Sequence, residues 1–141
     1  MTTRVDIIDQ LYDDIKGKYS KSNSYDFDLM KLDIASPDTF NTKQFPSVSF
    51  YGYGDPILEE TLSGPNQRSF QILLTGYVKA SVWRDIYRLC EDMEKFLYST
   101  DCELNIKLDE AGPRFYSNTT MLAAGLACFD LEFNIQYTQN I

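Results

Sequence analysis

The sequence predicts an α+β domain: a mostly antiparallel or mixed sheet of four to five strands, with two helices packed on one of its faces. Three observations predict it. Two segments repeat apolar residues at spacings of three and four, which is typical of amphipathic helices. Other segments alternate apolar and polar residues, which is typical of half-buried strands. Consecutive strands are also close enough in the chain to form antiparallel pairs.

The first helix is expected from about Thr3 to about Lys18. Its start is marked by Thr3 and by Asp6 three residues later, where a carboxylate favours the positive end of the helix dipole. The second helix is expected over residues 82–97, with Ser81 as its N-cap. The predicted apolar sides are Ile8, Leu11, Tyr12, Ile15 and Tyr19 in the first helix, and Val82, Ile86, Leu89, Cys90, Met93, Phe96 and Leu97 in the second.

The clearest predicted strand is at the end of the chain, where large apolar residues from Phe129 to Tyr137 alternate with polar ones. A weaker strand is expected to begin at Tyr25 and to continue less regularly to Ile34, whereas residues 114–120 are expected to be irregular. The other predicted strands cover residues 47–53, 68–79 and 102–108.

A polar, acidic segment at about residues 55–67 separates two of these strands. Two long strands joined in this way form an extended hairpin whose connection projects as an arm. Two interpretations stay open: the arm reaches a neighbouring subunit, or it is an ordinary surface loop.

Length and composition indicate one domain over residues 1–141, since 43% of its residues are hydrophobic and 24% are charged. The net charge of -8 makes binding to a nucleic-acid backbone by counterion release unfavourable. No N-terminal signal peptide is expected. No membrane association is expected either, because the longest mostly apolar run, residues 121–129, is about half of a membrane-spanning helix.

The sequence predicts no catalytic site, no metal site and no cofactor. It contains no histidine, the commonest general base and metal ligand. The three cysteines are widely spaced and are expected to be small buried residues. The stretch Gly52-Tyr53-Gly54 lacks the third glycine of a dinucleotide-binding turn.

The order and spacing of the elements resemble the small tail-terminator and tail-completion proteins of long-tailed bacteriophages. The likeness extends over nearly the whole chain and includes an N-terminal amphipathic helix, an acidic arm, a helix like Val82 to Leu97 and a final alternating strand. The likeness also includes a proline-led strand, Phe45-Pro46-Ser47-Val48-Ser49-Phe50, and a long strand that ends in Leu74-Thr75-Gly76-Tyr77-Val78.

The resemblance implies a structural virion protein rather than an enzyme. Such proteins form a ring, usually a hexamer, which caps the tail tube, ends its polymerisation and docks the tail to the head or neck. The implied partners are other copies of the chain, the tail tube protein, a neck or connector protein, and the tail sheath if the tail is contractile. Assembly would take place in the bacterial cytoplasm, and DNA would pass through the acidic lumen without specific binding.

A closed ring needs one surface patch that meets a different patch on the next copy. The candidates for the first patch lie on the aromatic strand and the arm, and those for the second, or for docking, lie near residue 115. Two alternatives stay open: a neck or connector subunit of the same particle, and a monomeric small-molecule module or carboxylate enzyme. The candidate interface residues are Tyr51, Tyr53, Ile57, Leu58, Glu59, Glu60, Phe115 and Tyr116.

Overall fold

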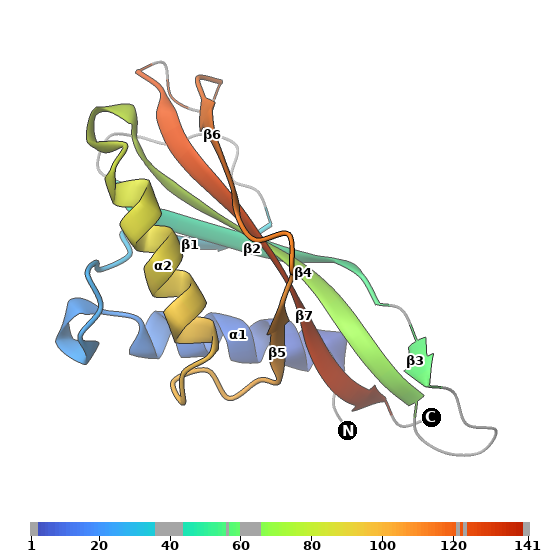
Figure 1. Cartoon of the computed structure of the whole chain (residues 1–141). Helices are drawn as coiled ribbons and strands as arrows, with labels where there is room; N and C mark the ends of the chain where they lie inside the picture. Colours follow the sequence, from blue (N-terminus) through green and yellow to red (C-terminus); the bar gives the residue numbers. More distant parts are fainter. Residues whose placement is uncertain are drawn as a thin grey trace.

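The computed structural model describes residues 3–35, 44–55, 57–59, 66–120, 122 and 124–139. It contains two α-helices, two short 3-10 helices and a seven-stranded sheet (Figure 1). The helices are α1 (Arg4–Lys18), η1 (Lys21–Asn23), η2 (Ala80–Val82) and α2 (Asp85–Leu97). The strands are β1 (Lys31–Ile34), β2 (Ser47–Gly54), β3 (Ile57–Glu59), β4 (Asn66–Lys79), β5 (Ile106–Leu108), β6 (Arg114–Asn118) and β7 (Leu126–Gln139).

The sheet is mixed, as predicted. Its main path has the order β1-β2-β4-β7-β5, while β3 pairs with β4 and β6 pairs with β7. Strands β1 and β2 are parallel, and the other pairs are antiparallel. The centre is the β4–β7 pair, which runs in continuous register from Asn66 opposite Gln139 to Lys79 opposite Leu126. The α+β prediction is confirmed, and the expected four to five strands correspond to the main path.

Both helices pack on one face of the sheet, as predicted (Figure 1). Strand alternation directs one set of side chains to this face. Phe50, Leu74 and Leu131 form one cross-strand row of it, and all three are buried. They share a core with Leu11 of α1 and Met93 of α2. The core of the domain therefore lies between the helices and this face.

The opposite face, which we call the open face, carries the other set of strand residues. A small second core cluster of Tyr77, Leu126 and Cys128 lies at one end of it, packed against Phe45 and Leu122. Polar residues are more frequent farther along the strands. The next cross-strand rows are Ser49–Thr75–Asp130, which is wholly polar, and Tyr51–Leu73–Glu132, which is mixed.

Local sequence signals explain where α1 begins but not where α2 begins. The hydroxyl of Thr3 accepts from the backbone N–H of Asp6 at 3.1 Å, and the carboxylate of Asp6 accepts from the N–H of Thr3 at 3.0 Å. This is a capping box. The predicted N-cap at Ser81 is wrong, because residues 80–82 form η2 and α2 follows Arg84 without a side-chain cap.

Three strand predictions need correction. Tyr25 is not in a strand; its ring stacks on Tyr19 with 4.8 Å between centroids, and β1 begins only at Lys31. The predicted strand over residues 102–108 shortens to β5. Residues 114–118, expected to be irregular, form β6 because β7 offers them an edge to pair with.

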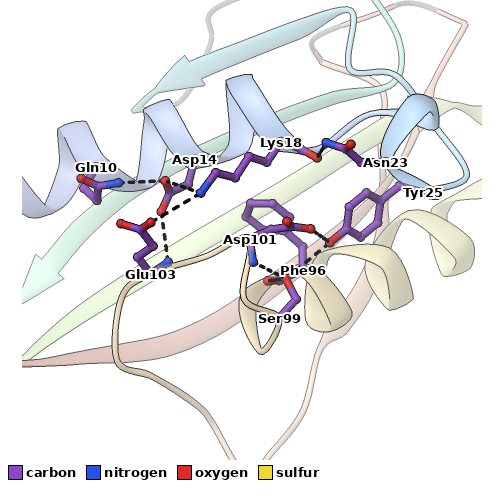
Figure 2. Close-up of polar contacts among 9 residues, drawn as sticks. All are labelled: Gln10, Asp14, Lys18, Asn23, Tyr25, Phe96, Ser99, Asp101 and Glu103. Atoms are coloured by element: carbon purple, nitrogen blue, oxygen red, sulfur yellow. Dashed lines mark hydrogen bonds and ion pairs between the residues drawn. The ribbon is translucent and has the colours of Figure 1, made fainter.

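Polar contacts hold α1 against the segment that follows α2 (Figure 2). The buried carboxylate of Asp14 accepts from the amide of Gln10 at 2.8 Å and from the backbone N–H of Glu103 at 3.3 Å. The Tyr25 hydroxyl donates to Asp101 at 2.8 Å. Since a buried carboxylate needs hydrogen-bond donors, the bond from the N–H of Glu103 to Asp14 holds α1 in place against this segment.

Candidate interaction surfaces

The open face carries a hydrogen-bond network centred on Asp130, which is only 9% exposed. Its Oδ1 accepts from the hydroxyls of Thr75 and Tyr116, both at 2.9 Å. Its Oδ2 accepts from the guanidinium of Arg114 at 2.8 Å. Three strands, β4, β7 and β6, are therefore joined through one carboxylate.

This network shifts the protonation equilibria of its members. Partial burial, followed by the hydrogen bond to Asp130, raises the pKa of Tyr116, because both favour the neutral phenol. The hydrogen bond to Asp130 likewise raises the pKa of Arg114. Because Asp130 accepts from three donors, we interpret its carboxylate as an anchor for β6 rather than as a general base.

A hollow of about 460 Å³ lies next to this anchor. Leu73, Asp130 and Glu132 line it from the sheet, and the rest is lined by residues 111–113 of the turn before β6 and by Arg114 of β6. Its volume is within the range of small-molecule pockets.

Tyr51 and Tyr53 lie on β2, where the sequence placed them, and have exposed fractions of 37% and 50%. Tyr51 is in the open-face row with Leu73 and Glu132. Tyr53 lies at the irregularity between Gly52 and Gly54. Partial burial, then the negative charges of Glu132 and Asp109, raise its pKa. The two tyrosines thus form an exposed aromatic surface at the edge of the open face.

The predicted arm is partly built into the sheet. Residues 57–59 form β3, in which Ile57 pairs with Arg68 and Glu59 pairs with Gln67, and β4 already begins at Asn66. Of the candidate interface residues, Ile57, Leu58 and Glu59 therefore have strand backbone. Glu60 lies outside the described residues.

The base of this hairpin is fixed by Asp55, whose side chain is 8% exposed. Its Oδ2 accepts from Arg4 Nε and from the Tyr137 hydroxyl, both at 2.5 Å. Its backbone carbonyl accepts from Arg68 at 2.7 Å. The start of the hairpin is thus tied to α1, β4 and β7, so its orientation is set by the domain.

Phe115 and Tyr116 were predicted as one patch, but the structure separates them. Tyr116 points to the open face, where it reaches Asp130. Phe115 points to the helix side, and its ring lies 4.8 Å from that of Tyr87 on α2. Adjacent residues of a strand face opposite sides of the sheet, so these two cannot serve the same contact surface.

A second exposed surface, which the sequence reasoning missed, surrounds Phe115. The rings of Trp83 and Tyr87 meet edge to face with 6.1 Å between centroids, and Arg84 lies 5.1 Å from the centre of the Trp83 ring. The exposed fractions of Trp83, Tyr87 and Phe115 are 49%, 45% and 39%. We call this surface the aromatic–arginine patch and define it as Trp83, Arg84, Tyr87, Arg88 and Phe115.

A sequence signal for this patch exists. Trp83 is the only tryptophan in the chain, and Tyr87 follows it by four residues, a spacing that places two side chains on one side of a helix. The predicted apolar side of this helix includes neither residue, so the pattern of apolar residues does not reveal them as a surface of their own. Two hollows adjoin the patch, of about 270 and 220 Å³, the first lined in part by Arg84 and Arg88.

The three cysteines are buried and free, and their burial confirms the prediction. Burial raises the pKa of Cys128 to about 12, so its thiol stays protonated near neutral pH and is a weak nucleophile. Among the described residues, no three cysteine, aspartate or glutamate side chains gather as a metal site would require. In the same part of the chain, no helix has the length and apolar character needed to span a membrane.

Comparison of the sequence with models of known protein families gives no match, and comparison with curated proteins finds no relative.

Proposed function

We propose that the protein is a ring-forming virion subunit of the tail-terminator type, which caps a phage tail tube and docks it to the head or neck. One observation carries the proposal: the described surface groups exposed large aromatic residues in two separate places, beside single ones such as Tyr98. Tyr51 and Tyr53 lie on β2, and the aromatic–arginine patch lies at the start of α2 and on β6. Two different surfaces on one small domain are what a ring with neighbours above and beside it requires.

The hairpin of β3 and β4 supports the same function. Its base is held by Asp55. The start of β4 and the end of β7 extend, together with β3, past the helices (Figure 1). Such a projection adds little to the core of its own domain. In a ring it would extend the contact with the next copy or with the tail tube.

The charge of the chain also fits. A ring of subunits that each carry a net charge of -8 would present no attractive surface to DNA in its lumen. DNA would slide through such an opening without adhesion, because few basic groups would be available to replace its counterions.

A neck or connector subunit would show the same surfaces and differ only in which ring it contacts. A small-molecule binding module is the candidate from another class, favoured by the hollow beside Asp130. The mass of the protein in solution and on tubes separates a binding module from both ring-forming candidates, because a binding module stays monomeric in both conditions.

The test uses purified tail tubes and the full chain. We expect electron microscopy to show a ring of this protein on one end of each tube, and we expect the capped tubes to stop elongating when tube protein is added. Tubes isolated with their head end already closed serve as the control and should bind no additional ring. Uncapped tubes that continue to elongate in excess protein would contradict the proposed function. A ring that binds only to isolated heads or necks would favour the connector alternative.

A further inference from the structure

We propose that the aromatic–arginine patch of one copy binds the acidic side of α1 in the next copy. This inference rests on the proposed ring function and assigns its lateral contact, which leaves Tyr51 and Tyr53 for contacts with other rings. Contacts of this kind are heterologous, because a patch meets a different surface on each neighbour.

The composition of the patch is that of an interface centre. Tryptophan, tyrosine and arginine are the residues that most often carry binding energy between proteins. Here Trp83 and Tyr87 are about half exposed. The aromatic ring of Tyr87 contacts that of Trp83 on one side and that of Phe115 on the other. A lone exposed aromatic residue needs no explanation, but three in contact, flanked by arginines, indicate a binding surface.

The charge of the patch selects its partner. Arg84 makes no ion pair within the described part of the chain, and Arg88 reaches only Asp85, at 3.8 Å across an exposed helix surface. A pair of this kind contributes little. A patch with two arginines is best complemented by carboxylates, and a chain with a net charge of -8 has many to offer.

The side of α1 that faces away from the core supplies such carboxylates. Asp6, Asp9 and Asp13 are all exposed and are spaced three and four residues apart, so they share one side of the helix. Asp6 caps the helix. The side chains of Asp9 and Asp13 form neither a hydrogen bond nor an ion pair within the described residues. They are therefore available to the arginines of another copy.

The positions of the two surfaces prevent a contact within one chain. The patch lies at the first turn of α2 and on β6, whereas α1 meets α2 farther along, where the Tyr19 hydroxyl donates to Asp92 at 2.7 Å. Figure 1 shows the start of α2 away from α1 and the later part of α2 beside it. Repetition of a contact between two such separate surfaces arranges copies head to tail, and such an arrangement can close into a ring.

Charge reversal tests the contact from both sides. The first variant carries Arg84→Glu and Arg88→Glu, and the second carries Asp9→Lys and Asp13→Lys. Each variant alone would oppose like charges at every contact, so we expect its self-association to weaken about a hundredfold or more. An equal mixture should assemble, because the two variants can alternate. The acidic patch of the first variant then meets the basic α1 of the second, and the native patch of the second meets the native α1 of the first. Sedimentation of the separate and mixed proteins, alone and on tail tubes, measures this effect.

A matched control carries Lys21→Glu and Lys107→Glu, both at exposed positions outside the two surfaces, and changes the net charge as much as the first variant does. We expect it to associate as the wild type does. The thermal midpoints of all variants should agree with that of the wild type, because the substituted side chains are exposed.

The fluorescence of Trp83 gives a second measurement without any substitution. As the only tryptophan, it should shift its emission to shorter wavelength and become protected from a soluble quencher when copies associate. Assembly without a change in Trp83 emission would overturn the contact.

The outcomes separate the inference from the proposed function. If the wild type and the first variant associate equally, the contact is wrong and the ring function stands. If each variant is weakened but the mixture does not recover, the partner surface is not α1, and the inference is wrong in that respect. If the wild type associates neither in solution nor on tubes, both the contact and the ring function are wrong.

Discussion

The aromatic ring of Phe129 on β7 lies against the backbone of Gly76, its cross-strand partner on β4. A Cβ atom at position 76 would lie 2.1 Å from a ring carbon of Phe129, far inside contact distance. The ring is fully buried and cannot move aside into solvent. This glycine in the middle of a strand is therefore explained by the close approach of a side chain rather than by backbone freedom.

Replacement of Gly76 by alanine should destabilise the domain. The added methyl group must displace a buried ring, and overpacking of this kind typically costs about 1 to 3 kcal/mol. The matched control is Gly17→Ala in α1, where no atom beyond the adjacent residues and the helix's own backbone lies within 4 Å of the new methyl group. That substitution should stabilise the domain by about 0.5 to 1 kcal/mol, since alanine favours a helix. Urea unfolding measures both changes, and equal stability of the two variants would contradict the packing at Gly76.

The pair Phe133→Ala and Glu132→Ala tests the register of β7. Phe133 is 1% exposed on the helix-covered face, so its truncation should cost about 3 to 5 kcal/mol through lost burial and a residual cavity. That loss approaches the whole stability of a small domain and should leave little soluble protein. Glu132 is exposed on the open face, and its truncation should leave the melting temperature nearly unchanged. Similar melting temperatures for both variants would show that the register is wrong.

Stability should fall in alkaline solution. Burial, then the hydrogen bond to Asp92, raises the pKa of Tyr19 above its ordinary value of 10.0, and burial also raises the pKa of Tyr77 and Tyr116. Above about pH 10 the unfolded chain releases these protons while the folded chain retains them. The contribution of these tyrosines to the free energy of unfolding is therefore fully present below that pH. It is lost as the pH rises toward their pKa values in the folded chain.

Urea unfolding between about pH 8 and about pH 11 measures this loss, and tyrosinate absorbance follows the ionisation. The variant Tyr19→Phe should lose less stability per pH unit in this range. At neutral pH it should be less stable than the wild type, because Asp92 loses one of its donors and keeps the N–H of Asp26 at 2.8 Å. A pH dependence identical to that of the wild type would show that Tyr19 does not contribute.

Removal of residues 57–63, with glycine closing the gap, tests the hairpin arm. Folding should persist, since loop closure depends only weakly on length and Asp55 keeps its contacts with Arg4 and Tyr137. Capping of tail tubes should fail if the arm contacts a neighbouring subunit or the tube. Unchanged melting together with normal capping would identify the segment as a surface loop, the alternative that the sequence left open.

The sequence by itself determined most of the buried residues in the long elements, although Val82, predicted on the apolar side of the second helix, is exposed and Ile7, which was not predicted, is buried. The alternation in β7 identified Phe129, Phe133 and Ile135 as core residues, and all are at most 1% exposed. Thr3 and Asp6 marked the start of α1, and the spacing of apolar residues predicted both helices. These features are local: strand alternation, helix periodicity and capping each depend on residues a few positions apart, so they can be read without knowledge of the fold.

Only the tertiary structure decided the parts that depend on distant partners. Tyr25 alternates as a strand residue would, yet it packs against Tyr19 and Phe96 because α1 and α2 place those rings nearby. Residues 114–118 lack a strong pattern, yet β7 pairs with them and turns Phe115 and Tyr116 to opposite faces. The aromatic–arginine patch joins α2 with β6, and its members are separated in sequence by more than twenty residues. Pairing and packing of this kind follow from which elements become neighbours in the fold, and single-segment patterns contain no such information.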